Sequence, residues 1–184
     1  MKKKIAILGS TGSIGKILLD IVNQNKNIAE VSLLTAHKDY NTLLKQAKKF
    51  NVKNLIIHDL NSYIKIKKKI KRNINIYNSV DSFTKSNNKK LDNVIVGISG
   101  LSGLLPTIQI IPFTKNISSA NKESIICGWN FIKKQLNKNY TKFIPIDSEH
   151  FSIWTILNNI EKKHVSKIYL TASGGPLLNK SKSQ

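Results

Sequence analysis

The chain has 184 residues, enough for one full domain or for one domain and the beginning of a second. Hydrophobic residues make up 40% of it and charged residues 22%, which excludes a largely disordered, collagen-like or coiled-coil protein. The net charge of +20 alone would suggest nucleic acid as a partner, yet Arg72 is the only arginine beside 29 lysines, and arginine is favoured for recognising bases and phosphates. Because lysine, asparagine and isoleucine all have A/T-rich codons, we attribute the charge to base composition. We expect no nucleic-acid partner and interpret the lysine cluster at 65–72 as a solvated helix face.

No apolar run approaches the roughly 20 residues that cross a membrane, and the four apolar residues after the N-terminal lysines are too few for a signal peptide. The single cysteine, Cys127, excludes an internal disulfide and a cysteine-rich zinc site, and it fits a reducing compartment. It lies in an apolar stretch of an expected helix, so we predict a buried small side chain rather than a nucleophile. We expect a cytoplasmic protein without membrane attachment.

Short β-like segments alternate with longer helical segments, which predicts βαβ units and a mainly parallel sheet. Strands are expected at 4–9, 30–36, 53–58, 74–77, 93–97, 115–119, 142–146 and 167–172. Helices are expected at 12–25, 40–50, 60–71, 101–111, 122–138 and 149–160, and loops in the Lys/Asn-rich stretches at about 65–90 and 133–142. The expected fold class is α/β, a doubly wound Rossmann-like parallel sheet followed by the beginning of an α+β catalytic domain.

The first strand-to-helix turn has the pattern Gly-x-x-Gly-x-x-Gly over residues 9–15. Glycines permit a tight turn and close approach to a pyrophosphate, and the following helix N-terminus supplies N–H donors. The hydroxyls of Ser10, Thr11 and Ser13 can add donors to phosphate oxygens. The alternative is a tight turn with a helix cap. We expect the helix to face the sheet with an apolar stripe formed by Ile14, Ile17, Leu18, Ile21 and Val22.

The end of the second strand indicates which dinucleotide is bound, because NAD-binding folds usually place a carboxylate there for the ribose 2′-hydroxyl. Here the strand end carries His37 and Lys38, two potential cations, which favours the 2′-phosphate of NADP. Asp39 keeps NAD open, and an ordinary polar loop is the alternative.

Two later segments also fall at strand ends. Lys122 and Glu123 follow Asn121 where a strand meets a helix, and they can hold a phosphate or enediol and a nicotinamide amide, or can form a capping box or surface ion pair. Asp147 and Glu149 point to the same face of an extended segment, with Ser148 between them, and supply two oxygen ligands for a divalent metal; a helix cap is the alternative.

The segment at 171–176 contains Ser173 before Gly174 and Gly175, and these residues can form an anion cradle at a strand end; the alternative is an ordinary turn.

Together these residues resemble 1-deoxy-D-xylulose 5-phosphate reductoisomerase. The motifs that match that family are G-S-T-G-S-I-G at 9–15, V-G-I-S-G-L at 96–101, A-N-K-E-S at 120–124, P-I-D-S-E-H at 145–150 and S-G-G-P at 173–176. The chain departs from it at His37 and Asp39, where members usually have Gly and Asn. The family rearranges a linear ketose phosphate and reduces the product with NADPH to 2-C-methyl-D-erythritol 4-phosphate, in non-mevalonate isoprenoid synthesis.

The resemblance implies a role for each matching residue. The pyrophosphate of NADPH would lie on Gly9, Ser10, Thr11, Gly12, Ser13, Ile14 and Gly15, its 2′-phosphate would meet Lys38 beside His37, and its nicotinamide half would lie against Asn121 and Glu123. The sugar phosphate would contact Lys122, Ser148, Glu149 and Ser173. Asp147 and Glu149 would ligate Mg²⁺ or Mn²⁺, with Co²⁺ as an alternative, and the catalytic residues would be Lys122, Asp147 and Glu149.

By the same resemblance, residues 1–140 form the NADP-binding domain and 141–184 the start of a truncated metal- and substrate-binding domain. Family chains continue further, with a third metal-binding Glu and a flap over the substrate, so we expect an N-terminal part that forms a homodimer when the full chain exists. The alternatives are a catalytically inactive NADP-binding module, an oxidoreductase of the aspartate-semialdehyde type, against which the buried setting expected for Cys127 argues, and a basic nucleic-acid binder.

Overall fold

A computed structural model describes residues 2–70, 73–87 and 89–170 of the chain. The chain divides into two compact units, Met1–Asp147 and Ser148–Gln184. Within the described part, no helix is both long and apolar enough to cross a membrane.

The first unit is built on a parallel sheet, to which the described residues contribute seven strands in the order β4-β3-β2-β1-β5-β6-β7. The doubly wound α/β prediction is therefore confirmed. The strands are β1 (Lys3–Leu8), β2 (Ala29–Ala36), β3 (Asn54–Ile57), β4 (Asn75–Tyr77), β5 (Leu91–Val96), β6 (Thr114–Ser119) and β7 (Lys142–Pro145).

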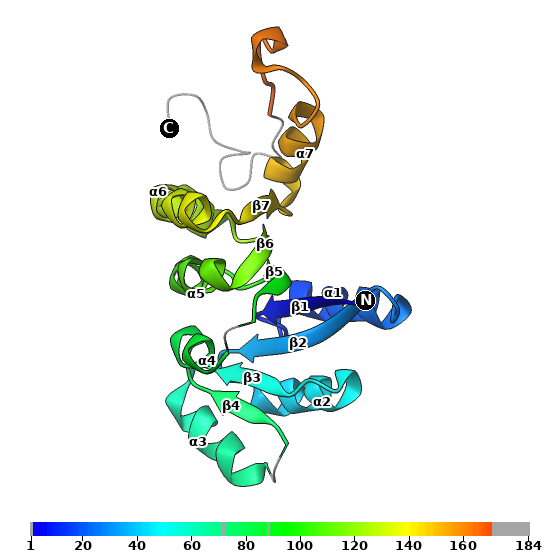
Figure 1. The fold of residues 1–184 in the computed structure, drawn as a ribbon, viewed down its shortest axis with the longest axis vertical. Coiled ribbons are helices and arrows are strands. Elements are labelled where there is room, and N and C mark those ends of the chain that lie inside the picture. Colours follow the sequence, from blue (N-terminus) through cyan, green and yellow to red (C-terminus); the bar gives the residue numbers. More distant parts are fainter. Residues whose placement is uncertain (1, 71–72, 88, 171–184) are drawn as a thin grey trace, which may run out of the picture. The chain divides into compact units, whose positions relative to one another are not determined.

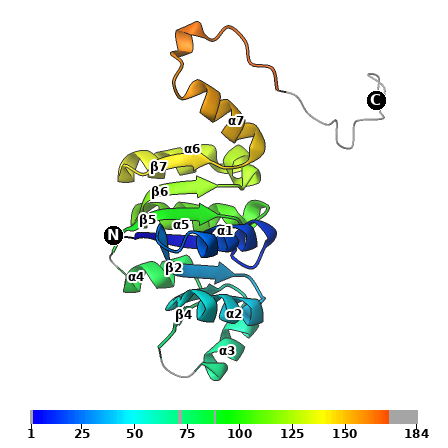
Figure 2. The same ribbon diagram turned by 90° about the vertical axis from the view of Figure 1, so that its right-hand side faces the viewer.

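Helices cover both faces of this sheet (Figures 1 and 2). On one face lie α1 (Ser13–Gln24), α2 (Tyr40–Phe50) and α3 (Leu60–Lys69), which bury Leu19, Leu43 and Ile66 among the strand residues. On the other lie α4 (Val80–Ser86), α5 (Leu104–Ile110) and α6 (Lys122–Asn139), with 3₁₀ turns at Leu101–Gly103 and Ile111–Phe113. Strands that are apolar on both faces, such as Ile5 to Leu8, are typical of a buried parallel sheet.

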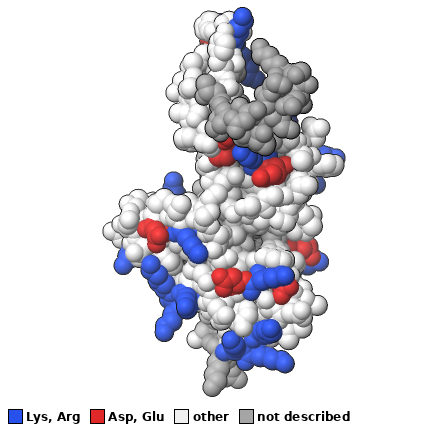
Figure 3. Space-filling view, turned by 180° about the vertical axis from the view of Figure 1, so that it is seen from behind, with Lys and Arg blue, Asp and Glu red and all other residues white. Residues whose placement is uncertain are grey.

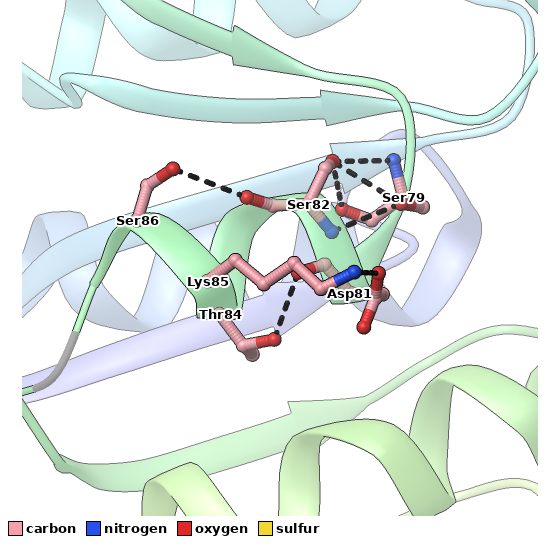
Figure 4. Close-up of polar contacts among 6 residues, drawn as sticks. All are labelled: Ser79, Asp81, Ser82, Thr84, Lys85 and Ser86. Atoms are coloured by element: carbon pink, nitrogen blue, oxygen red, sulfur yellow. Dashed lines mark hydrogen bonds and ion pairs between the residues drawn. The ribbon is translucent and has the colours of Figure 1, made fainter.

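Helix α4 lies in the stretch that composition predicted to be loop. It begins with a capping box: the Ser79 hydroxyl accepts a hydrogen bond from the Ser82 backbone N–H at 3.1 Å, and the Ser82 hydroxyl accepts one from the Ser79 N–H at 3.2 Å (Figure 4). Lys85 pairs with Asp81 at 2.7 Å one turn apart, and the buried Phe83 packs edge-on against Tyr77. Polar residues in this segment therefore form the ends and outer face of a helix.

The expected stripe on α1 is wrong at two positions. Ile17 and Ile21 are 60% and 50% exposed, whereas Gly15 and Leu19 are the buried residues of the helix. The reason is that Gly15 packs directly on the preceding loop, which rotates the helix so that its inner face runs through Gly15 and Leu19.

Lysines of α3 are exposed, as expected for a solvated helix face. Two of them lie over aromatic rings, with Lys67 Nζ 4.9 Å from the Tyr63 centroid and Lys69 Nζ 4.9 Å from that of Tyr40. Figure 3 shows lysine and acidic side chains interspersed over one side of the molecule. In the contacts of Lys67 and Lys69 with the tyrosine rings, the charged ammonium group stays in solvent while the apolar part of the lysine side chain packs against the protein surface.

The second unit contains α7 (Ser148–Leu157) and a 3₁₀ turn at Lys162–His164. Residues 167–170 of the strand expected at 167–172 are not in a strand, and 171–172 lie outside the described residues. Side chains of α7, together with Ile160 and residues 164–170, line a groove of about 750 Å³ in this unit, and the lining includes Ser148 and Glu149. The predicted division of the chain at residue 140 stays a prediction; β7, which follows it, pairs with β6 in the sheet.

Candidate functional site

The candidate site lies where the sheet reverses its winding. β1 pairs with β2 on one side and with β5 on the other, and the helices that follow β1 and β5 lie on opposite faces. In open α/β sheets a crevice forms at this switch point, beyond the carboxyl ends of the strands. Here the loop Gly9–Gly15 leaves β1 beside Gly97, whose N–H donates to the Leu8 carbonyl at 2.8 Å.

Glycines are required at two positions of this loop. Gly9 has φ +81°, the left-handed region, and a side chain there would meet the Gly97 backbone at 3.1 Å. A Cβ on Gly15 would lie 2.4 Å from Ser10 Cα and 2.5 Å from the Gly9 carbonyl oxygen. Close packing at Gly15 brings the N-terminus of α1 against the loop, where the unpaired N–H groups of the first turn and the helix dipole favour an anion.

Ser10 differs from the other two hydroxyl residues of the loop. It is fully buried: its hydroxyl donates to Gln46 Oε1 at 2.8 Å, its N–H donates to the Thr35 carbonyl at 2.8 Å, and its carbonyl accepts from Gln46 Nε2 at 2.8 Å. The prediction that the Ser10 hydroxyl serves a phosphate is therefore wrong, because both donors of the residue are used within the protein. Ser13 is exposed and Thr11 is half-buried, so those hydroxyls stay candidates.

The end of β2 presents His37 and Lys38 to solvent at the same edge of the sheet. Asp39, the carboxylate that kept NAD open, caps α2 by accepting from the Thr42 N–H at 3.0 Å, and this bond lowers the pKa of the Asp39 carboxyl. Because the Asp39 carboxylate is engaged as the cap of α2, His37 and Lys38 remain the candidates for contact with the cofactor at this strand end.

The neighbouring strand end adds residues that the sequence analysis did not single out. The Asp59 N–H donates to the His37 carbonyl at 3.0 Å, and Asp59 caps α3 through the Ser62 N–H at 2.9 Å. Burial, and secondarily the charge of His37, lowers the pKa of His58. The signal that could have identified His58 in the sequence is its place directly after β3, which lies two strands from β1 and its glycine loop in the sheet.

The segment after β6 is held by Asn121, which is 1% exposed. Its Oδ1 accepts from the Ser124 N–H at 2.7 Å as the N-cap of α6, and its Nδ2 donates to the carbonyls of Ile98 and Gly100 at 2.6 and 2.7 Å. The alternative of a helix cap is thus present, and it ties the loop after β5 to α6. Lys122 and Glu123 are exposed on the first turn of α6.

The candidate metal ligands fall in different units. Asp147 ends the first unit, and Glu149 lies in the first turn of α7, where its Oε2 accepts from the Ser148 hydroxyl at 2.9 Å. No three His, Cys, Asp or Glu side chains in residues 2–70, 73–87 and 89–170 are grouped to hold a metal ion. Ser173 lies outside the described residues.

Cys127 is exposed on α6, so the prediction of a buried cysteine is wrong. The buried face of that helix carries Ser124, Gly128, Ile132 and Leu136, and Cys127 is off this line by one residue. Gly128 packs against the Leu104 side chain, which would have to shift to accept a Cβ there, because that Cβ would lie 2.3 Å from Leu104 Cδ1.

Sequence comparison places the chain in a known family. The family model for 1-deoxy-D-xylulose 5-phosphate reductoisomerase matches residues 5–128, and the model for the C-terminal domain of the same enzyme matches residues 143–184. The 1-deoxy-D-xylulose 5-phosphate reductoisomerases of Pelagibacter ubique and Wolbachia pipientis wMel are 53% and 40% identical to the chain, over 97% and 99% of its length. The chain spans 47% and 46% of those two proteins, slightly less than half.

Solved structures agree with this placement. The 1-deoxy-D-xylulose 5-phosphate reductoisomerase from Zymomonas mobilis in complex with NADPH superposes with a TM-score of 0.87 at 29% identity, covering 98% of this chain and 48% of that one. A DOX-P reductoisomerase in complex with NADPH, fosmidomycin and magnesium gives a TM-score of 0.84 at 28% identity, covering 99% and 48%.

Proposed function

The chain belongs to the 1-deoxy-D-xylulose 5-phosphate reductoisomerase family, and from this premise we propose that it supplies the NADPH-binding half of an enzyme that converts 1-deoxy-D-xylulose 5-phosphate to 2-C-methyl-D-erythritol 4-phosphate. The observation that carries the proposal is the tight glycine loop between β1 and α1 at the switch point of the sheet. NADPH is the hydride donor of this reaction.

In this proposal the cofactor is bound by residues that follow three strands, β1, β2 and β6, at one edge of the sheet. The N–H groups at the start of α1, with Thr11 and Ser13, bind the pyrophosphate. His37 and Lys38 after β2 bind the 2′-phosphate, and Asn121 and Glu123 after β6 bind the nicotinamide half. This assignment is supported by the strand order β2-β1-β5-β6, which brings the ends of all three strands to the carboxyl edge of one parallel sheet, where ligands of open α/β sheets bind.

The remaining family motifs give the residues that we propose for the substrate and the metal. Lys122, Ser148, Glu149 and Ser173 bind the sugar phosphate, and Asp147 and Glu149 bind Mg²⁺ or Mn²⁺, with Co²⁺ as an alternative. A hard divalent cation takes several oxygen ligands, and two carboxylates supply only part of them. When bound, the metal would polarise the substrate oxygens. Residues 141–184 form the start of this substrate- and metal-binding part, after a cofactor domain at 1–140.

The assembled enzyme is a cytoplasmic homodimer in this proposal, with a small sugar phosphate rather than nucleic acid as its partner. On the face shown in Figure 3 acidic side chains lie among the lysines, and this mixture of charges bears only on the expectation that nucleic acid is not a partner.

Calorimetric titration of the 184-residue chain with NADPH and NADH tests the cofactor assignment: NADPH should bind more tightly. Turnover of 1-deoxy-D-xylulose 5-phosphate should be absent for residues 1–184 alone and should appear when a segment corresponding to the remaining half of the Pelagibacter relative is added. Robust turnover by the chain alone would show that we have misassigned the residues the reaction needs.

The second candidate is a catalytically inactive NADP-binding module. It is favoured by the lack of any grouping of three metal-ligating side chains among the described residues. NADPH binding without turnover in the reconstituted mixture would select it.

A further inference from the structure

Gln46 lies on the buried face of α2, in line with Leu43 and Ala47, where an apolar side chain would be expected. It is 9% exposed, and its carboxamide reaches the backbone and hydroxyl of a residue 36 positions earlier. A buried polar side chain in an apolar stripe requires partners, and both partners of Gln46 are atoms of Ser10.

The two hydrogen bonds between Gln46 and Ser10 are reciprocal. Gln46 Oε1 accepts from the Ser10 hydroxyl at 2.8 Å, while Gln46 Nε2 donates to the Ser10 carbonyl at 2.8 Å. Thr35 completes the attachment, since its carbonyl accepts the Ser10 N–H and its hydroxyl accepts the Gly9 N–H at 2.9 Å. Every polar group of Ser10 is therefore held by β2 or α2.

This arrangement joins two parts of the proposed cofactor site. The glycine loop continues from Ser10 into the N-terminus of α1, and α2 begins two residues after Lys38. A displacement of the loop relative to α2 would break both carboxamide bonds, and two parallel bonds to one residue fix orientation as well as distance.

We propose that Gln46 is a positioning residue for dinucleotide binding: through Ser10 it holds the glycine loop in the shape that receives the pyrophosphate, in register with the 2′-phosphate site at Lys38. The inference rests on the proposed function, and it adds a residue that touches no ligand itself. Because Gln46 acts on the loop alone, it contributes to ligands that carry a pyrophosphate and not to those that carry only the 2′-phosphate.

The test compares two probes, NADPH and adenosine 2′-monophosphate, which has the 2′-phosphate but no pyrophosphate. Gln46→Met keeps the length of the side chain and removes both hydrogen bonds. It should weaken NADPH binding by about tenfold or more and leave adenosine 2′-monophosphate within about twofold of the wild-type chain, with both affinities measured by calorimetry where the variant is folded. The exposed Gln24, replaced by Met, is the matched control and should change neither affinity.

Gln46→Glu provides a second test if Gln46→Met does not fold. A protonated carboxyl can donate to the Ser10 carbonyl and accept from its hydroxyl, as the carboxamide does, whereas a carboxylate cannot donate. The NADPH affinity of Gln46→Glu, divided by the wild-type value at each pH, should therefore rise as pH falls.

Amide exchange gives a readout that needs no ligand: the Ser10 N–H should exchange faster in Gln46→Met than in the wild-type chain. Unchanged NADPH affinity, or an equal loss for both probes, would overturn the inference. If the wild-type chain does not bind NADPH at all, the proposed function fails, and the exchange measurement still decides whether Gln46 holds the loop.

Discussion

Replacing Gly15 by alanine should destabilise the first unit and weaken NADPH binding together. The added Cβ would lie 2.4 Å from Ser10 Cα and 2.5 Å from the Gly9 carbonyl oxygen, both backbone atoms that no rotamer change can move away. Ser10 cannot yield easily, because its polar groups are held by Gln46 and Thr35. The N-terminus of α1 must move outward, and this overpacking should lower the free energy of unfolding of the first unit by about 1–3 kcal/mol.

For a unit of this size, about 2 kcal/mol lowers the melting temperature by roughly 4–8 °C. Thermal unfolding followed by circular dichroism measures this shift, and calorimetry measures the affinity for NADPH. Gly12→Ala is the matched control for the melting temperature alone, because a Cβ there meets its nearest neighbour, the Gly9 carbonyl oxygen, at 3.4 Å in ordinary contact. If Gly15→Ala melts within about 1 °C of the wild-type chain, the close approach we describe does not exist.

Three further outcomes are expected. Lys38→Glu should remove most of the preference for NADPH over NADH, and equal affinities of the wild-type chain for the two cofactors in calorimetry would reject the 2′-phosphate assignment. The chain should bind Mn²⁺ weakly, and replacing both Asp147 and Glu149 by their amides should abolish that binding; an unchanged affinity in the double variant would show that the two carboxylates act only at the start of a helix. Since burial lowers the pKa of His58 from its ordinary 6.5, the folded state disfavours the protonated form; stability should therefore fall as pH drops below about 6.5, and less so in His58→Gln, as thermal melts between pH 5 and 7.5 can show.

The sheet could be predicted from the sequence because strands such as β1 and β3 contain continuous apolar segments, and turn signals separate the segments along the chain. Helix α4 could not, since serine, threonine and lysine in a row indicate a loop by composition, and only the capping box and the packing of Phe83 make them a helix. The error at Ile17 and Ile21 has a related cause: several apolar stripes fit the same helix, and contact of Gly15 with the loop selects one.

The three strand ends of the candidate site could also be predicted from the sequence. The sequence did not indicate which of their polar groups form hydrogen bonds within the protein and which face solvent. Asn121 illustrates this. The motif predicts a residue at the nicotinamide half, and the structure adds that its side chain caps α6 and bonds two carbonyls of the loop after β5. Those carbonyls lie more than 20 residues earlier in the chain, and no local pattern reports such a partner.

The three hydroxyl residues of the glycine loop show why position in a motif is not enough. Ser10, Thr11 and Ser13 each carry a hydroxyl group and lie in the same motif. In the structure, however, Ser10 turns inward to Gln46 and Thr35, whereas Ser13 is exposed. A buried hydroxyl needs a hydrogen-bond partner, so the Ser10 side chain can point inward only because Gln46 and the Thr35 carbonyl are there to accept its hydrogen bond. The shape of the loop is therefore a tertiary property: grafting residues 9–15 onto another strand and helix without an equivalent of Gln46 would remove the partner of the Ser10 carbonyl and one partner of its hydroxyl, and the grafted loop should lose the conformation that aims the N–H groups of α1 at an anion.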